Sequence, residues 1–141
     1  NEVIKLLQEV KPHQVFVAGD LADPHGTHKV CLNAALAAIH ELRNEDWMQD
    51  CRVWMYRGAW AEWEIDHIEM AVPISPEELR RKRNSILKHQ SQMESAPFLG
   101  NDERLFWQRA EERNQATAKM YSNLGLASYE AIEAFVQYTI L

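Results

Sequence analysis

The sequence predicts an α/β fold, a three-layer α/β/α sandwich built on a mainly parallel sheet. The first observation is an alternation of short apolar runs of strand length with longer helical stretches along the chain. The second is composition, because 141 residues with 46% hydrophobic and 26% charged side chains suit one globular domain with a real core. The third is a polar turn between the first strand and the next helix, at residues 19–28.

The first half of the chain predicts one helix followed by a β-α-β unit. Residues 3–10 predict an opening helix, and residues 14–19 predict a buried strand. The helix expected over residues 27–43 has apolar side chains almost all round, so we expect a covered crossover helix. Strands are expected at Arg52–Tyr56 and Ile68–Val72.

The sequence predicts a helix start at Ser75, which we expect to be the N-cap. Pro76 suits the first helical position, and Glu78 completes a capping box at the positive end of the helix dipole. This helix is expected to run to about Gln90. Its basic run, residues 80–83, is expected to be a solvated face balanced by glutamates rather than an anion site.

The last third of the chain predicts another helix and a segment of ambiguous type. Asp102 is expected to cap the helix, and Gly125 to end it as a left-handed C-cap. The tail, residues 129–138, has the alanine and glutamate content of a helix but the aromatic, β-branched end of a strand.

Charge and composition exclude several classes of function. The net charge is −6 and no basic stripe alternates with aromatics, so no nucleic-acid partner is expected. No apolar run is long enough to cross a bilayer, and no signal peptide opens the chain, so no membrane partner is expected either. Cys31 and Cys51 have no metal-site spacing and indicate buried thiols in a reducing cytoplasm.

The turn at residues 19–28, Gly-Asp-Leu-Ala-Asp-Pro-His-Gly-Thr-His, is the strongest functional signal. It places His25 and His28, with Asp20 and Asp23, between a strand's carboxyl end and a helix's amino end, where open α/β sheets bind ligands. Neutral imidazole is a common metal ligand, so the turn predicts part of a metal or acid–base site. The alternative is an ordinary turn in which Thr27 or Asp23 only caps the helix.

A second motif, Lys-Arg-Asn-Ser-Ile-Leu-Lys-His-Gln-Ser-Gln at residues 82–92, follows at a distance. Together with Asp-Pro-His-Gly-Thr-His at residues 23–28, it resembles the PIG-L/LmbE-like zinc-dependent N-acetylglucosaminyl deacetylases in order and spacing. The resemblance covers most of the chain and implies a Rossmann-like sandwich that lacks its first β-α unit. It also implies that the tail is a late strand.

Two further segments, at residues 54–60 and 106–114, resemble a narrower bacterial group within this superfamily. In that group a glucosamine-6-phosphate deaminase (isomerase) domain precedes a deacetylase-like domain. The resemblance therefore implies that residues 1–141 are the carboxyl-terminal portion of such a deacetylase-like domain. The first residue is Asn rather than Met, and a helix is already under way at residue 3, which fits this expectation.

The resemblance implies zinc-assisted hydrolysis of the acetamide of N-acetylated amino sugars or their phosphates, with zinc bound in the intact parent protein. His28 would be a zinc ligand, and His25 would stabilise the oxyanion or protonate the leaving amine. Gly26-Thr27 replaces the usual Pro-Asp, so Asp20 or Asp23 would have to orient an imidazole from the second shell of the site. The His-Pro-Asp-Asp motif that supplies the other ligands is absent, so we expect this chain alone to bind zinc weakly or not at all and to be inactive.

Other candidate residues have two interpretations each. His89 matches the family's helix-end histidine and either lies near the site or is structural. Arg57, Trp60 and Trp63 form a loop that could stack on a sugar ring, or could pack in the core or at a subunit interface.

The alternative function is a non-catalytic module that binds sugar or assembles subunits beside the deaminase domain. We expect a homo-oligomer in either case, because a missing first strand leaves an unpaired sheet edge.

Overall fold

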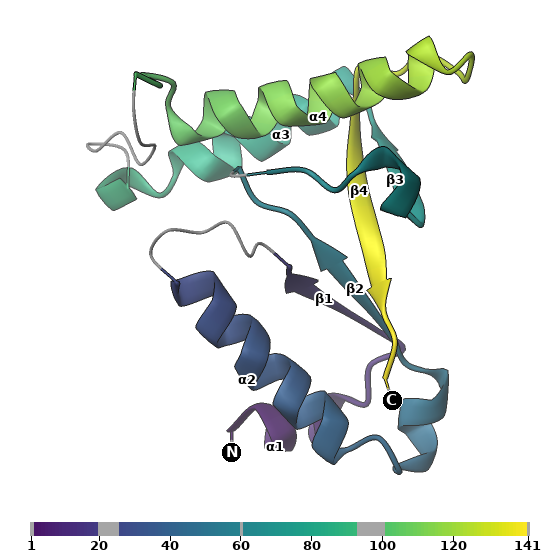
Figure 1. The fold of residues 1–141 in the computed structure, drawn as a ribbon. Coiled ribbons are helices and arrows are strands. Elements are labelled where there is room, and N and C mark those ends of the chain that lie inside the picture. Colours follow the sequence, from purple (N-terminus) through teal and green to yellow (C-terminus); the bar gives the residue numbers. More distant parts are fainter. Residues whose placement is uncertain (1, 20–25, 60, 93–100, 141) are drawn as a thin grey trace. The chain divides into compact units, whose positions relative to one another are not determined.

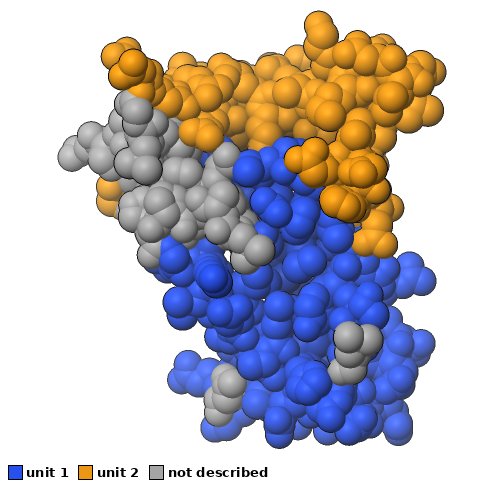
Figure 2. Space-filling view, in the orientation of Figure 1, with its two compact units in different colours: residues 1–63, 135–141 blue, residues 64–134 orange. Residues whose placement is uncertain are grey.

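The computed structural model describes residues 2–19, 26–59, 61–92 and 101–140. They form two compact units, coloured separately in Figure 2. Unit 1 comprises residues 1–63 and 135–141, and unit 2 comprises residues 64–134.

Unit 1 begins with helix α1 (Glu2–Val10), strand β1 (Gln14–Ala18) and helix α2 (Thr27–Glu41). A 3₁₀ turn, η1 (Asp46–Asp50), leads into strand β2 (Arg52–Tyr56). β1 and β2 pair in parallel. α2 runs back alongside β1 and forms the crossover connection between the two strands (Figure 1). The predicted helix, strand, helix and strand are all confirmed here.

The core of unit 1 lies between the two helices and one face of the strands. Val53 of β2 is 1% exposed, and Ala38 and Ile39 of α2 are fully buried. The outer side of α2 is exposed, with Val30 at 68%, so the expectation that α2 is covered all round is wrong. The reason is that only one stripe of a helix packs against the strands, and small alanines occupy much of the rest.

Unit 2 begins with the 3₁₀ turn η2 (Ile65–His67), strand β3 (Met70–Ile74), helix α3 (Pro76–Leu87) and the 3₁₀ turn η3 (Gln90–Gln92). Helix α4 (Phe106–Asn123) then leads to strand β4 (Ala131–Tyr138), which passes from unit 2 into unit 1. β3 starts and ends two residues later than expected, because η2 occupies the preceding segment and Pro73 is accepted in an edge strand.

β4 settles the ambiguous tail as a strand. It pairs antiparallel with β2, so that Val53 faces Tyr138 and Tyr56 faces Phe135. The strand order is β1-β2-β4-β3, a mixed sheet. The chain is therefore an α/β protein with four α-helices and four strands among the described residues, in keeping with a Rossmann-like sandwich that lacks some units.

The predicted capping of α3 is confirmed in full. The Glu78 N–H donates to the Ser75 hydroxyl oxygen at 3.2 Å, and the Ser75 N–H donates to the Glu78 carboxylate at 2.8 Å. These hydrogen bonds hold the pKa of Glu78 below its ordinary value. The helix ends at Leu87, a little before the expected residue, since the chain tightens into η3.

The predicted cap at the end of α4 is confirmed, whereas the predicted cap at its start is wrong. At its end, Gly125 has φ 83°, and the N–H groups of Gly125 and Leu126 donate to the carbonyls of Ser122 and Tyr121. This is a Schellman C-cap, as predicted. At its start, the cap is Leu105 rather than Asp102, so that prediction is wrong. Gln108 accepts the Leu105 N–H there at 2.8 Å.

Asp102 has a different partner from the one expected. Its carboxylate accepts hydrogen bonds from the guanidinium groups of Arg104 and Arg109, at 2.8 and 3.0 Å. The hydrogen bond from Arg104 is the main cause that lowers the pKa of Asp102 to about 2. Charge pairing with two arginines therefore outweighs helix capping at this carboxylate.

Candidate functional site

The candidate site begins where β1 and β2 end side by side, at Ala18 and Tyr56. The N–H of Gly19 donates to the Tyr56 carbonyl at 2.7 Å and extends the pairing by one residue. A Cβ at Gly19 would lie 2.9 Å from Cβ of Met55 and 3.0 Å from Cζ2 of Trp63. Glycine is therefore required for the chain to leave β1 so close to its neighbours.

Arg57 and Trp63 form a stacked pair at the same carboxyl end. The guanidinium carbon of Arg57 lies 3.9 Å from the centroid of the Trp63 ring, a cation–π contact. Both side chains are half-buried, and Nε1 of Trp63 is a buried donor with no hydrogen-bond partner in the described part of the chain. Arg57 and Trp63 were expected in one loop, whereas the packing of Trp63 against Gly19 was not predicted, because it joins two segments that are distant in the sequence.

His28 lies in the first turn of α2, and its side chain is exposed. Gly26 is the N-cap with φ 72°, and its carbonyl accepts the Val30 N–H at 3.0 Å. Among the described residues, no side chain caps the start of α2. Capping by Thr27 is therefore wrong.

The remaining predicted site residues are not brought together in the described part of the structure. Asp20, Asp23, His25 and Trp60 lie outside the described residues. His89 is exposed in unit 2, with Nδ1 3.2 Å from the Ser85 carbonyl oxygen. Among the described residues, no three His, Cys, Asp or Glu side chains gather into a group that could hold a metal ion.

A buried polar cluster in unit 2 was also missed from the sequence. Nζ of Lys82 in α3 donates to Oδ1 of Asn114 in α4 at 2.8 Å and pairs with the Glu133 carboxylate in β4. Asn114 is fully buried, and its Nδ2 donates to the Ile132 carbonyl at 3.0 Å. The signal in the sequence is Asn114 itself, a polar residue at helical spacing with Ala110, Thr117 and Ala118 on the buried stripe.

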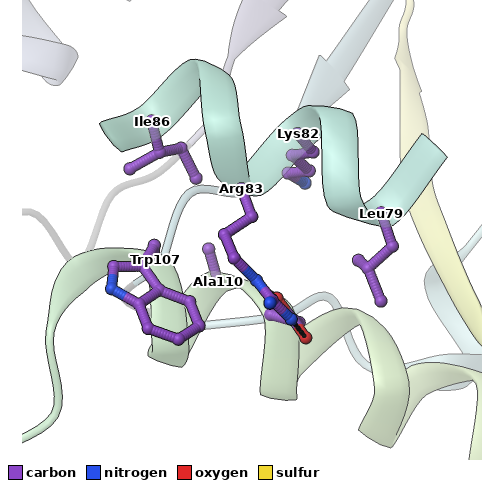
Figure 3. A pocket seen from close by; sticks show the side chains of 7 residues that line it. Leu79, Lys82, Arg83, Ile86, Trp107 and Ala110 are labelled. Atoms are coloured by element: carbon purple, nitrogen blue, oxygen red, sulfur yellow. Dashed lines mark hydrogen bonds and ion pairs between the residues drawn. The ribbon is translucent and has the colours of Figure 1, made fainter. Parts of the chain in front are cut away.

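Arg83 fills the space between α3 and α4, as Figure 3 shows. Its guanidinium forms a bidentate ion pair with Glu111 and lies 4.9 Å from the centroid of the Trp107 ring. The basic run at residues 80–83 is therefore solvated only in part. Arg81 forms an exposed pair with Glu77, but Lys82 and Arg83 are half-buried in helix packing, so the expectation is wrong for these two.

The two cysteines differ. Cys51 is 8% exposed, and burial raises the pKa of its thiol, whereas Cys31 on α2 is exposed. The expectation of two buried thiols is thus wrong for Cys31. In the part of the chain that the structure describes, no helix has both the length and the apolar character needed to cross a bilayer.

Comparison with known proteins gives one informative relative. A protein of Bacteroides thetaiotaomicron named "Putative glucosamine-6-phosphate deaminase-like protein" is 74% identical over 141 aligned residues. The match covers 97% of this chain but 21% of the relative, so the chain spans about a fifth of that protein's length. No protein-family model matches the chain.

Proposed function

We propose that this chain is part of a zinc-dependent deacetylase-like domain that acts on N-acetylated amino sugars within a larger protein of amino-sugar metabolism. The observation that carries the proposal is the position of His28. It stands in the first turn of α2, and α2 follows β1, whose carboxyl end lies beside that of β2. Open α/β sheets bind ligands at this edge.

The name of the relative supports an amino sugar as the class of substrate. Its printed name refers to an amino-sugar phosphate, and its identity of 74% to this chain is high. Since the chain matches only 21% of the relative, the whole protein's reaction belongs to this proposal. The substrate we propose is an N-acetylated amino sugar or its phosphate.

In this proposal His28 and His25 have different roles. Zinc, when bound, would polarise the acetamide carbonyl and make a bound water acidic. His28 would be a ligand, and His25 would hydrogen-bond to the developing oxyanion or give a proton to the leaving amine. Because a catalytic zinc site takes about three protein ligands and the described residues hold no such group, further ligands would come from the rest of the polypeptide.

The test is made on the full-length protein. Zinc content is measured after dialysis, and acetate release is followed with N-acetylglucosamine and with its 6-phosphate. We expect one zinc per chain, and acetate release that stops with a chelator and returns with added zinc. Absence of both zinc and acetate release would replace this proposal with the non-catalytic sugar-binding module.

A further inference from the structure

The backbone of β1 bonds to β2 through alternate residues. The His13 carbonyl accepts the Arg52 N–H at 2.9 Å, and the Gly19 N–H donates to the Tyr56 carbonyl at 2.7 Å. In a parallel pair every second residue turns both of its backbone groups to the same neighbour, so the odd-numbered residues of β1 face β2. The even-numbered residues turn their N–H and C=O groups to the outer edge: Gln14, Phe16 and Ala18. Among the described residues no strand lies beyond β1 on this side.

The composition of β1 does not protect this edge from another strand. Its sequence, Gln-Val-Phe-Val-Ala, has no proline, glycine or charged residue, which are the usual means of keeping a sheet edge unpaired. The edge strand at the other end of the strand order, β3, contains Pro73. Phe16 is 50% exposed in the middle of β1. β1 therefore has the composition of a strand that pairs on both sides.

The elements next to this edge carry most of the exposed apolar surface of unit 1. In the described part of this unit, four of the five large apolar side chains that are exposed lie on α1, β1 or α2: Leu6, Val10, Phe16 and Val30. α2 packs against both α1 and β1. Exposed apolar side chains on neighbouring elements are typical of a surface that contacts another protein.

β1 is complementary to itself in the antiparallel direction. When two copies meet with Phe16 opposite Phe16, the two phenylalanines exchange both backbone hydrogen bonds. Gln14 of each copy then does the same with Ala18 of the other, so that every outward N–H and C=O group of the strand is paired. Val15 lies opposite Val17 of the other copy, on the face that packs against the core of unit 1, and β-branched pairs of this kind are favourable.

We propose that β1 is a dimerisation strand, which pairs antiparallel with β1 of a second copy about a two-fold axis at Phe16. The axis is perpendicular to the sheet, so α1 and α2 of both copies lie on the same face of one continuous sheet. The symmetry of Val-Phe-Val at residues 15–17 favours a second copy, because one register satisfies the backbone and both faces. The competing occupant is a strand from the rest of the longer polypeptide, and the experiment distinguishes the two.

Disulfide cross-linking of the full-length protein tests the register. In a background where Ser replaces the exposed Cys31, Phe16→Cys places two thiols opposite each other at the axis. Their Cα atoms would be about 5.5 Å apart, within the span of a disulfide. The matched control, Gln14→Cys, lies on the same side of the same strand, but its two copies would be about 14 Å apart along the strands. Under a mild oxidant we expect a covalent dimer for Phe16→Cys and none for Gln14→Cys or the background protein.

Sedimentation velocity of the full-length protein gives a second measurement that does not depend on a disulfide. Phe16→Lys puts a charge at the axis and should reduce the mass of the assembly to about half of the wild-type value. The control, Val72→Lys, replaces an exposed valine of β3 and should leave the mass unchanged. Circular dichroism checks that both variants are folded.

Several results would overturn this inference. A monomeric wild type would do so, and the occupant of the edge would then be a strand from the rest of the polypeptide. No cross-link with Phe16→Cys, or equal cross-linking with Gln14→Cys, would exclude the two-fold register. An unchanged mass for folded Phe16→Lys would place the contact between copies elsewhere. None of these measurements depends on zinc or acetate release, so the proposed function stands or falls separately.

Discussion

The ammonium group of Lys82 donates a 2.8 Å hydrogen bond to Oδ1 of Asn114, a side chain with no exposed surface. This contact joins α3 to α4, and Asn114 in turn donates to the Ile132 carbonyl on β4. A single buried amide therefore links three elements of unit 2. Every hydrogen bond to a buried group of this kind carries a large cost if its partner is removed.

Replacing Asn114 with Ala should lower the free energy of unfolding by about 1–3 kcal/mol, because Lys82 and the Ile132 carbonyl each lose a partner. Urea unfolding followed by circular dichroism measures this. The matched control is Asn84→Ala, an exposed asparagine on α3, which should change stability little. Equal effects at the two positions would show that the cluster does not stabilise unit 2.

Replacing Gly19 with Ala should lower the free energy of unfolding by about 1–3 kcal/mol, the usual cost of overpacking. The added Cβ would lie 2.9 Å from Cβ of Met55 and 3.0 Å from Trp63. Trp63→Phe in the same chain should relieve the second contact and recover part of the loss, which a double-mutant cycle by thermal unfolding measures. Full stability of the single variant would contradict the close approach seen here.

Replacing His28 or His25 with Ala in the full-length protein should distinguish the binding of zinc by His28 from the catalytic role of His25. His28→Ala should lose zinc and acetate release together, because a ligand supports both. His25→Ala should keep zinc while turnover falls by about two to four orders of magnitude. Metal analysis after dialysis and an acetate assay check both. Zinc loss in the His25 variant would reverse the assignment or make both imidazoles ligands.

Asp102 should make stability depend on pH only in the acid range. The pKa of its carboxyl is about 2 in the folded chain against an ordinary 3.8, so its contribution is fully present above about pH 4. That contribution is lost as pH falls toward 2, because the unfolded chain binds a proton first. Unfolding free energies at several pH values should show a shallower slope between pH 4 and 2 for Asp102→Asn than for wild type. Identical slopes would count against the ion pairs with Arg104 and Arg109.

The two thiols should react at different rates. Cys31 is exposed, whereas Cys51 is buried with a raised pKa, so little Cys51 thiolate is present near neutral pH. A short iodoacetamide pulse on the native protein, followed by peptide mass spectrometry, should label Cys31 well ahead of Cys51. In urea the two should be labelled equally. Early labelling of Cys51 in the native protein would contradict its burial.

The features that the sequence alone determined are those set by neighbouring residues. Ser75, Pro76 and Glu78 define the start of α3 within four positions, and Gly125 defines the end of α4 by its positive φ. Short apolar runs of strand length were enough for β1 and β2. The placement of His28 in the first turn of α2 also followed from the local strand–turn–helix order.

Contacts between distant residues decided the rest. The tail is a strand because it pairs with β2. Asp102 does not cap α4, because its carboxylate pairs with two arginines instead. Lys82 and Glu133 are 51 positions apart, and no local pattern predicts that they meet. The close approach of Trp63 to Gly19 likewise exists only once β1 and β2 lie side by side. Local chemistry thus specified the elements and their ends, whereas burial and charge pairing across elements decided which side chains became partners.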